Sequence, residues 1–422
     1  MIVGRGVWKL IVGTLRIFGA LPVAVRLLLV NQLAGNTAFY MLIPFLADYL
    51  LDDIGLSAVT VGVVLGVRNF SQQGLYLVGG STADRLGTRG VIVVGLAVRA
   101  VGFALFAAGG SLAVVLLAAV CTGFAGALFN PAVRAHIAHD SGTHRAEAFA
   151  LFNVFGNVGS TLGPLLGIAM VALGFRITAV AAAGIFAVLA IGQLLVLPSR
   201  PVERATTSVL GDLGELVANR AFWAFAVALV GMFALQSQIY FVLTLQAQQA
   251  AGPAGAAPAV AALFIAETVV SILFQVRVTR LCGAVARGRA MALGLSVMGS
   301  AFLVPPLGVL LVPPVPAAQL ATVVVAATVL AFGVMIAQPF VNELIPAFGP
   351  ARLTGTYFGA FYLLAGLTTV TLTPLLGAVV DAGGDALAWG PGLLCAAVAL
   401  GSAAAILRLH RRGAVPTPVV AG

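Results

Sequence analysis

The sequence predicts an all-α membrane protein with twelve transmembrane helices in two pseudo-symmetric six-helix bundles. Of its 422 residues, 61% are hydrophobic and only 8% are charged, and the mean hydropathy is +1.11. A water-soluble globule of this length needs more polar surface than this composition provides. Long apolar runs recur along the chain, and the second half repeats glycine and proline spacings of the first. Lipid is therefore the expected solvent for most of the chain.

The apolar runs fall into two groups of six on either side of a polar stretch. A bilayer crossing needs about 20 apolar residues. The sequence therefore predicts an N-terminal bundle (1–197) with an interfacial lead-in (1–20), a cytoplasmic linker (198–219), and a C-terminal bundle with a short cytoplasmic tail (220–422). A signal peptide is the other interpretation of the lead-in, but no small-residue cleavage site precedes the first span. The predicted spans are 21–47, 57–79, 90–109, 112–135, 147–173, 177–197, 220–246, 256–278, 288–312, 316–342, 353–379 and 389–408.

The distribution of charge predicts the orientation in the membrane. With the N-terminus in the cytoplasm, most basic residues lie in cytoplasmic segments and only Arg176 lies outside, as the positive-inside rule requires. The predicted external turns carry acids instead, among them Asp52 after the first span and Asp385 after the eleventh. Twelve spans then place both termini in the cytoplasm of a multi-pass cell-membrane protein. The net charge of +9 is attributed to this topology, and no nucleic-acid partner is expected.

Two segments of the second half echo the first. Gly156 and Pro164 of the fifth span correspond, at an offset of 210, to Gly366 and Pro374 of the eleventh. Asn130-Pro131-Ala132-Val133 similarly matches Gln338-Pro339-Phe340-Val341 at an offset of 208. Chance similarity explains matches between aliphatic residues, but ordered glycine and proline matches favour a duplicated six-helix unit.

The loop after the second span carries the most specific motif, Gly80-Ser-Thr-Ala-Asp84-Arg85-Leu-Gly87-Thr-Arg89. It resembles the cytoplasmic loop signature of the major facilitator superfamily, and the wider run 61–102 resembles the twelve-helix drug:proton antiporter branch of that family. Glycine permits close approach and tight turns, and an acid is favoured at a helix N-terminus. The resemblance implies a conformational latch in which Asp84 pairs with the start of the eleventh span near Arg352 and with Arg134. An ordinary charged turn is the alternative.

A second motif lies in the fifth span. It consists of Gly156, Gly159, Gly163, Pro164 and Gly167, and it resembles the glycine-proline signature of antiporters of the superfamily. A glycine stripe permits close helix packing, and proline kinks a helix. Simple packing is the alternative interpretation. The resemblance favours export.

Three ionisable residues lie deep in predicted spans, where such groups are functional candidates by default. They are Arg68, Arg99 and Glu267. Glu267 is the candidate for proton exchange, and a fixed ion pair or an interfacial position is its alternative. Arg68 is a substrate contact or a structural partner of a carbonyl or carboxylate. Related drug:proton antiporters often carry an arginine in the fourth span, but residues 112–133 of this chain hold no charge.

Polar residues on otherwise apolar helices are candidates for lining a central substrate cavity. Interhelical hydrogen bonds explain them equally well. The candidates are Asn31, Asn36, Gln236, Tyr240 and Gln338.

Taken together, these features favour a secondary transporter over an enzyme. The sequence shows no phosphate-binding glycine loop and no catalytic or metal-ligand constellation, so no cofactor is expected. By resemblance, the chain is expected to export small amphipathic, drug-like compounds in exchange for protons, as a monomer in the bilayer. A dedicated metabolite exporter and an uptake symporter remain alternatives. A multispan membrane enzyme or receptor is a distant alternative, because neither explains the paired halves and the loop signature.

Overall fold

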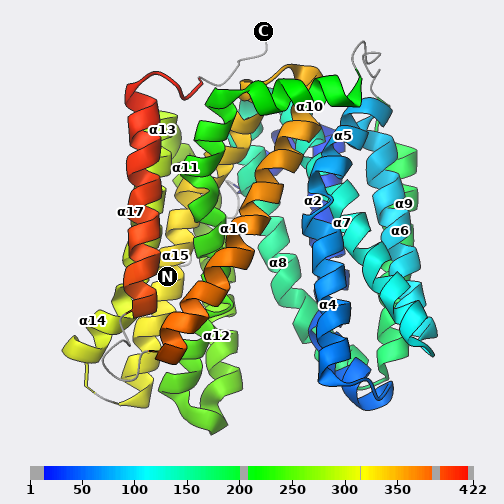
Figure 1. Cartoon of the computed structure of the whole chain (residues 1–422), viewed down its shortest axis with the longest axis vertical. Helices are drawn as coiled ribbons and strands as arrows, with labels where there is room; N and C mark the ends of the chain where they lie inside the picture. Colours follow the sequence, from blue (N-terminus) through cyan, green and yellow to red (C-terminus); the bar gives the residue numbers. More distant parts are fainter. Residues whose placement is uncertain (1–13, 200–207, 314, 383–389, 417–422) are drawn as a thin grey trace. The chain divides into compact units, whose positions relative to one another are not determined.

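The computed structural model describes residues 14–199, 208–313, 315–382 and 390–416. All regular secondary structure among these residues is helical (Figure 1). Residues 14–20 of the predicted lead-in are helical, whereas residues 1–13 and Asp385 lie outside the described part. The fold is therefore all-α, as predicted.

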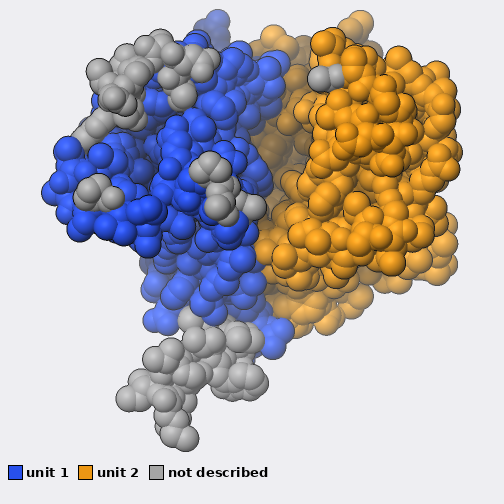
Figure 2. Space-filling view, turned by 90° about the horizontal axis from the view of Figure 1, so that it is seen from below, with its two compact units in different colours: residues 1–16, 219–347, 364–419 blue, residues 17–218, 348–363, 420–422 orange. Residues whose placement is uncertain are grey.

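The chain forms two compact units, shown in different colours in Figure 2. Unit 2 contains residues 17–218 and 348–363, and unit 1 contains 219–347 and 364–419. The helices of unit 2 are α2 (Val23–Leu42), α4 (Ala58–Gln73), α5 (Tyr76–Leu86), α6 (Thr88–Ala108), α7 (Leu112–Asp140), α8 (Arg145–Val171), α9 (Phe175–Val196) and α10 (Val209–Ala218). Those of unit 1 are α11 (Arg220–Gln236), α12 (Val242–Gly283), α13 (Arg287–Ala301), α14 (Val304–Leu311), α15 (Pro316–Leu344) and α17 (Gly390–Arg411). Helix α16 (Thr354–Ala382) contributes residues to both units.

Among the described residues, nine helices are long and apolar enough to cross a membrane, or ten if the bent pair α13 and α14 forms one span. The first two predicted spans are not among them. Helix α2 carries Arg26 and several amides along its length, and the second span is broken after Gln73 into α4 and α5. Polar residues in the first predicted span and a helix break in the second therefore distinguish these two segments from the continuous apolar helices of the other spans.

Aromatic and small residues build the interior of unit 2. Helix α2 packs against α8, and α6 packs against both α7 and α9. Phe103 of α6 stacks on Phe186 of α9 with ring centroids 5.2 Å apart. Large apolar side chains such as Val188 and Leu195 instead point outward, with exposures of 68% and 76%. Outward-facing apolar side chains are typical of helices surrounded by lipid. Such helices can lie in lipid because each one satisfies its own backbone hydrogen bonds.

A glycine separates α5 from α6. Gly87 has φ of 87°, a conformation that a residue with a Cβ rarely adopts. It ends α5 directly after Arg85 and Leu86 and starts α6 at Thr88. This sharp turn places Asp84 and Arg85 at the end of their helix, where they contact other segments of unit 2.

Candidate functional site

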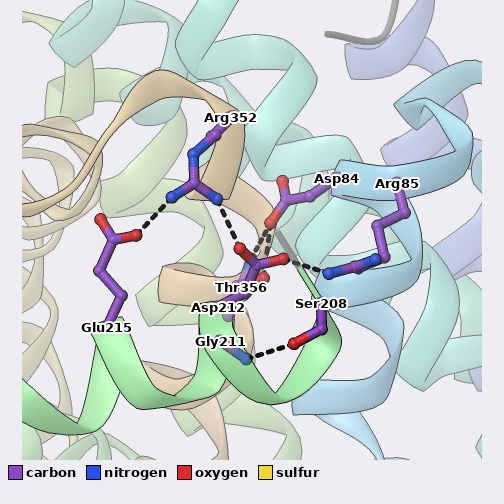
Figure 3. A network of polar contacts seen from close by, with 8 residues as sticks. All are labelled: Asp84, Arg85, Ser208, Gly211, Asp212, Glu215, Arg352 and Thr356. Atoms are coloured by element: carbon purple, nitrogen blue, oxygen red, sulfur yellow. Dashed lines mark hydrogen bonds and ion pairs between the residues drawn. The ribbon is translucent and has the colours of Figure 1, made fainter. Parts of the chain in front are cut away.

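Asp84 caps the N-terminus of α16. Its Oδ1 accepts a hydrogen bond from the backbone N–H of Gly355 at 2.7 Å. Its Oδ2 accepts from the N–H of Thr356 at 2.7 Å and from the Thr356 hydroxyl at 2.6 Å (Figure 3). The first N–H groups of a helix have no partner within the helix and carry partial positive charge, which favours an acid there. The partner of Asp84 is thus the first turn of α16, three and four residues beyond Arg352.

Two glycines allow α5 and α16 to approach so closely. A Cβ at Gly355 would lie 2.6 Å from the carbonyl oxygen of Gly80 and 2.8 Å from Oδ1 of Asp84. A Cβ at Gly80 would collide with the backbone of Gly355. Any side chain at either position would therefore push α16 away from the Asp84 carboxylate.

Burial acts against the charge of Asp84. It raises the pKa of the Asp84 carboxyl to about 7, against the opposing effect of the hydrogen bonds from Thr356 and Gly355, and the negative charge of nearby Asp212 adds to the increase. The carboxyl is therefore poised to change its protonation state near neutral pH.

A second contact joins Arg85, beside Asp84, to Arg352, just before α16. Asp212 of α10, which is 4% exposed, forms ion pairs with both arginines, and Oδ1 of Asp212 lies 2.5 Å from Nη1 of Arg352. Glu215 pairs with the other terminal nitrogen of Arg352 (Figure 3). The segment after residue 197 therefore supplies both acids that join these arginines.

Sequence reasoning missed the roles of Asp212 and Glu215 and treated them only as part of a polar linker. A usable signal was present, because Ser208 followed by apolar residues predicts a capped helix, and acids three residues apart share one helix face. In the structure the Ser208 hydroxyl accepts from the N–H of Gly211 at 3.1 Å, and Asp212 and Leu216 form the buried side of α10.

The other predicted latch residues make different contacts. Arg89 donates to the carbonyl of Leu194 at 2.5 Å, near the end of α9. Arg134 is not joined to Asp84. It donates to the carbonyl of Asn130 at 3.0 Å, and its guanidinium lies 4.3 Å from the ring centroid of Tyr362 in α16. Arg134 thus contacts α16 through an aromatic ring, while Asp84 accepts its hydrogen bonds from Gly355 and Thr356.

The glycines of α8 face α2. A Cβ at Gly159 would lie 2.5 Å from the carbonyl oxygen of Leu33, and one at Gly163 would lie 2.6 Å from Cβ of Tyr40. A Cβ at Gly167 would similarly meet the backbone of Met41. These residues share one face of the helix and bring two backbones together, as small-residue stripes do in membranes.

Of the polar candidates on α2, Asn36 also meets α8. Its side chain donates to the carbonyl of Gly156 at 3.1 Å. Asn31 is 1% exposed, and neither its Oδ1 nor its Nδ2 has a hydrogen-bond partner in the described structure. Pro164 lies within α8, between the glycines at 163 and 167. Asn36 therefore forms an interhelical contact at the N-terminal end of the glycine stripe of α8.

Two predicted arginines are buried in unit 2, each 8% exposed. Arg68 of α4 donates to Asn69 at 2.9 Å and to Oε1 of Gln72 at 3.1 Å. Arg99 of α6 has its guanidinium 5.4 Å from the ring centroids of both Phe39 and Phe186. The structure brings both arginines to the Phe39 ring, since the Arg68 guanidinium lies 4.6 Å from the same centroid.

The predicted pathway residues of unit 1 are dispersed. The Gln338 amide donates to Oε1 of Gln236 at 3.4 Å. Tyr240 is 59% exposed and its ring lies 5.1 Å from that of Phe264. Glu267 of α12 is half-buried, and no described residue forms a hydrogen bond or ion pair with it. Gln236 and Gln338 therefore meet, whereas the structure does not join Glu267 to them.

Unit 1 contains an ion pair that the sequence did not reveal. Nε of Arg287, at the start of α13, lies 2.8 Å from Oε2 of Glu343 near the end of α15. The guanidinium also lies 4.6 Å from the centroid of Phe340. The segment 277–289 contains no Asp or Glu, and the acid that pairs with its Arg287 is supplied by α15.

Comparison with known proteins identifies the family. Residues 28–371 match the family model of the Major Facilitator Superfamily. An uncharacterized MFS-type transporter of Mycobacterium tuberculosis is 40% identical over 390 residues, which cover 89% of this chain and 91% of that protein. The multidrug resistance protein MdtH of Klebsiella pneumoniae is 29% identical over 335 residues, covering 79% of this chain and 80% of MdtH.

A solved structure supports the fold. The fucose:proton symporter of E. coli superposes with a TM-score of 0.72 at 16% identity, covering 93% of this chain and 98% of the symporter. At this identity the likeness concerns the fold alone. Because the family model spans most of the residues and a relative of 40% identity covers nearly the whole chain, this protein belongs to the major facilitator superfamily of membrane transporters.

Proposed function

We propose that this protein exports small amphipathic compounds across the cell membrane in exchange for protons, by alternating access. The relatives named multidrug resistance protein support export of drug-like compounds. The glycine-proline motif of α8 supports antiport over symport, by its resemblance to antiporters of the family. In this proposal both termini are cytoplasmic, as the positive-inside rule predicts, and residues 1–197 and 220–422 form the two bundles.

The contact of Asp84 with the first turn of α16 carries the mechanistic part of the proposal. It joins the end of α5, in the first half of the chain, to the start of α16, in the second half, through two backbone donors and one hydroxyl. Asp212 reinforces it by joining the two flanking arginines. A transporter that alternates between states needs contacts that form in one state and break in another. We assign this role to the Asp84 and Asp212 contacts and call them the latch.

Glu267 is the proposed proton-exchanging group. A carboxyl within an apolar span is costly as a charge, and no described residue compensates it. Protonation on one side of the membrane and release on the other would couple its charge to the conformational cycle.

Transport into proteoliposomes tests the proposal. The purified protein is reconstituted, a pH gradient is imposed with the lumen acidic, and uptake of two amphipathic dyes, cationic ethidium and anionic anilinonaphthalene sulfonate, is followed by fluorescence. We expect gradient-driven uptake of at least one dye and its loss when nigericin collapses the gradient. Uptake driven only by the opposite gradient would indicate symport, and no movement of either dye would refute export of such compounds.

Two carboxyl variants test the coupling group. Glu267→Gln is expected to abolish the dependence of uptake on the pH gradient. Asp52→Asn, a matched loss of one carboxylate from an exposed position outside the spans, should leave that dependence unchanged. Gradient-driven uptake that persists in Glu267→Gln would exclude Glu267 as the coupling residue.

A further inference from the structure

A cluster of side chains inside unit 2 holds two positive charges close together. Arg68 comes from α4 and Arg99 from α6, and their guanidinium carbons lie 4.6 and 5.4 Å from the centroid of the Phe39 ring in α2. Each arginine is more than nine-tenths buried. Two cations therefore share one aromatic ring in the interior of a membrane-spanning bundle.

The cluster lacks a compensating acid. The hydrogen bonds of Arg68 go to the neutral amides of Asn69 and Gln72, and Arg99 contacts only aromatic rings among the described interactions. Neither arginine takes part in an ion pair of the described residues. The sequence contains no Asp or Glu within 54–83, 88–139 or 148–202. The acids of this part of the chain therefore lie near the ends of its helices.

The packing around the cluster makes room for these charges. A Cβ at Gly126 of α7 would lie 2.8 Å from Nη2 of Arg99 and 3.0 Å from Cδ of Gln72. Glycine at this position therefore accommodates both side chains. Gln72 also links the cluster to further polar groups, since its amide donates to the Tyr76 hydroxyl at 3.1 Å and that oxygen also accepts from Asn130 at 3.2 Å.

Aromatic contacts do not neutralise such a pair. Cation–π contacts offset only part of the cost of placing a charged side chain within a bilayer. Two like charges near one ring also repel each other. A ligand that brings a negative charge would relieve both costs, and the planar guanidinium matches the oxygens of a carboxylate or sulfonate.

We propose that Arg68 and Arg99 form an anion-binding site and that the transported compounds are amphipathic organic anions carrying a carboxylate or sulfonate. Phe39 offers an aromatic surface for the apolar part of the ligand, and Gln72 holds Arg68 in place. This inference rests on the proposed export function, because it names the substrate class of that function.

Binding to the purified, full-length protein tests the site directly. The probes are anilinonaphthalene sulfonate and N-phenylnaphthylamine, which share one aromatic skeleton and differ in the sulfonate. Isothermal titration calorimetry is expected to show at least tenfold tighter binding of the sulfonate. Arg68→Gln and Arg99→Gln should each remove most of this preference, since a charge-assisted hydrogen bond is lost. Equal binding of the two probes to the wild type, or an unchanged preference in both variants, would overturn the proposal.

Two further variants separate charge from folding. Arg99→Lys keeps the charge without the planar fork, so it should keep a reduced preference for the sulfonate. Arg220→Gln removes an exposed arginine of α11 and should leave the preference intact. If Arg99→Gln fails to give folded protein by size exclusion, the comparison of Arg99→Lys with Arg220→Gln decides, and equal preference in these two would overturn the assignment.

The transport assay distinguishes this inference from the export function. Uptake of anilinonaphthalene sulfonate by the wild type that is lost in Arg68→Gln supports both the export function and the anion site. Uptake of ethidium without uptake of the sulfonate leaves export standing and overturns the anion site. Movement of neither dye refutes the export proposal itself, while the calorimetric result still decides whether the arginines bind an anion.

Discussion

Replacement of Asp212 by asparagine should measurably lower the free energy required for local opening of α10. Asparagine keeps the shape of the side chain but removes the charge that holds Arg85 and Arg352. The Asp212 side chain is 5% exposed, and those of Arg85 and Arg352 are 25% and 26% exposed, so these bonds are partly shielded from water. A charge-assisted hydrogen bond contributes about 1 kcal/mol more than a neutral one. Two such bonds give about 2 kcal/mol, or about a 30-fold change in an equilibrium constant.

Hydrogen exchange measures this opening. In Asp212→Asn, the amides of Val209–Ala218 should exchange about 30-fold faster than in the wild type, as their local opening free energy falls by about 2 kcal/mol. The matched control is Glu215→Gln, because Glu215 is 42% exposed and such pairs contribute about 0.5 kcal/mol, or about twofold. If Asp212→Asn and Glu215→Gln exchange at the same rate, Asp212 does not hold the two arginines as we describe.

Three further predictions concern other parts of the chain. Gly163→Val should destabilise the protein by about 1–3 kcal/mol through overpacking against α2, whereas Gly184→Val, at a glycine with open space around it, should leave the thermal midpoint within error. Glu343→Gln should lower the free energy of unfolding by about 3 kcal/mol, because Arg287 loses its ion-pair partner. A thermal midpoint equal to that of the wild type would refute a stabilising role for this ion pair. Because the pKa of Asp84 is raised, the capped state binds its proton more tightly than an open state with an ordinary carboxyl. The cap should therefore weaken as pH rises from about 3.8 to about 7 and change little above that, and protection factors in the first turn of α16 should fall over this range in the wild type but not in Asp84→Asn.

Much of the helical architecture could be predicted from hydropathy alone. The predicted span 177–197 corresponds to α9, Phe175–Val196, and the sharp turn at Gly87 separates two helices as expected. Helix breaks were harder to predict. The second predicted span divides after Gln73 into α4 and α5, whereas the non-helical residue Gly252 of α12, with φ of 67°, lies between the predicted seventh and eighth spans, as expected. The predicted span 57–79 reads as one run in hydropathy, so the pattern does not show whether its polar residues around Gln73 mark a break or lie within one helix.

The candidate site was only partly predictable for a different reason. The loop motif identified Asp84 and the start of α16 as partners because the family resemblance specified both. Asp212 could not be placed in the same way, since a residue in a linker is free to meet any neighbouring segment until the path of the chain is known. The same limit applies to Glu343 and Arg287, which are 56 residues apart in the chain. Sequence spacing fixes contacts within a helix but not contacts between helices of undetermined order.

The glycine face of α8 has a mechanical consequence. Where Gly159, Gly163 and Gly167 meet α2, the contact consists largely of main-chain and Cβ atoms, so changes of side-chain rotamer can absorb little of a displacement. Such an interface is stiff and has little compliance. A displacement of the end of α8 at Arg145 should therefore displace α2 by a similar amount, so that the two helices move as one rigid body.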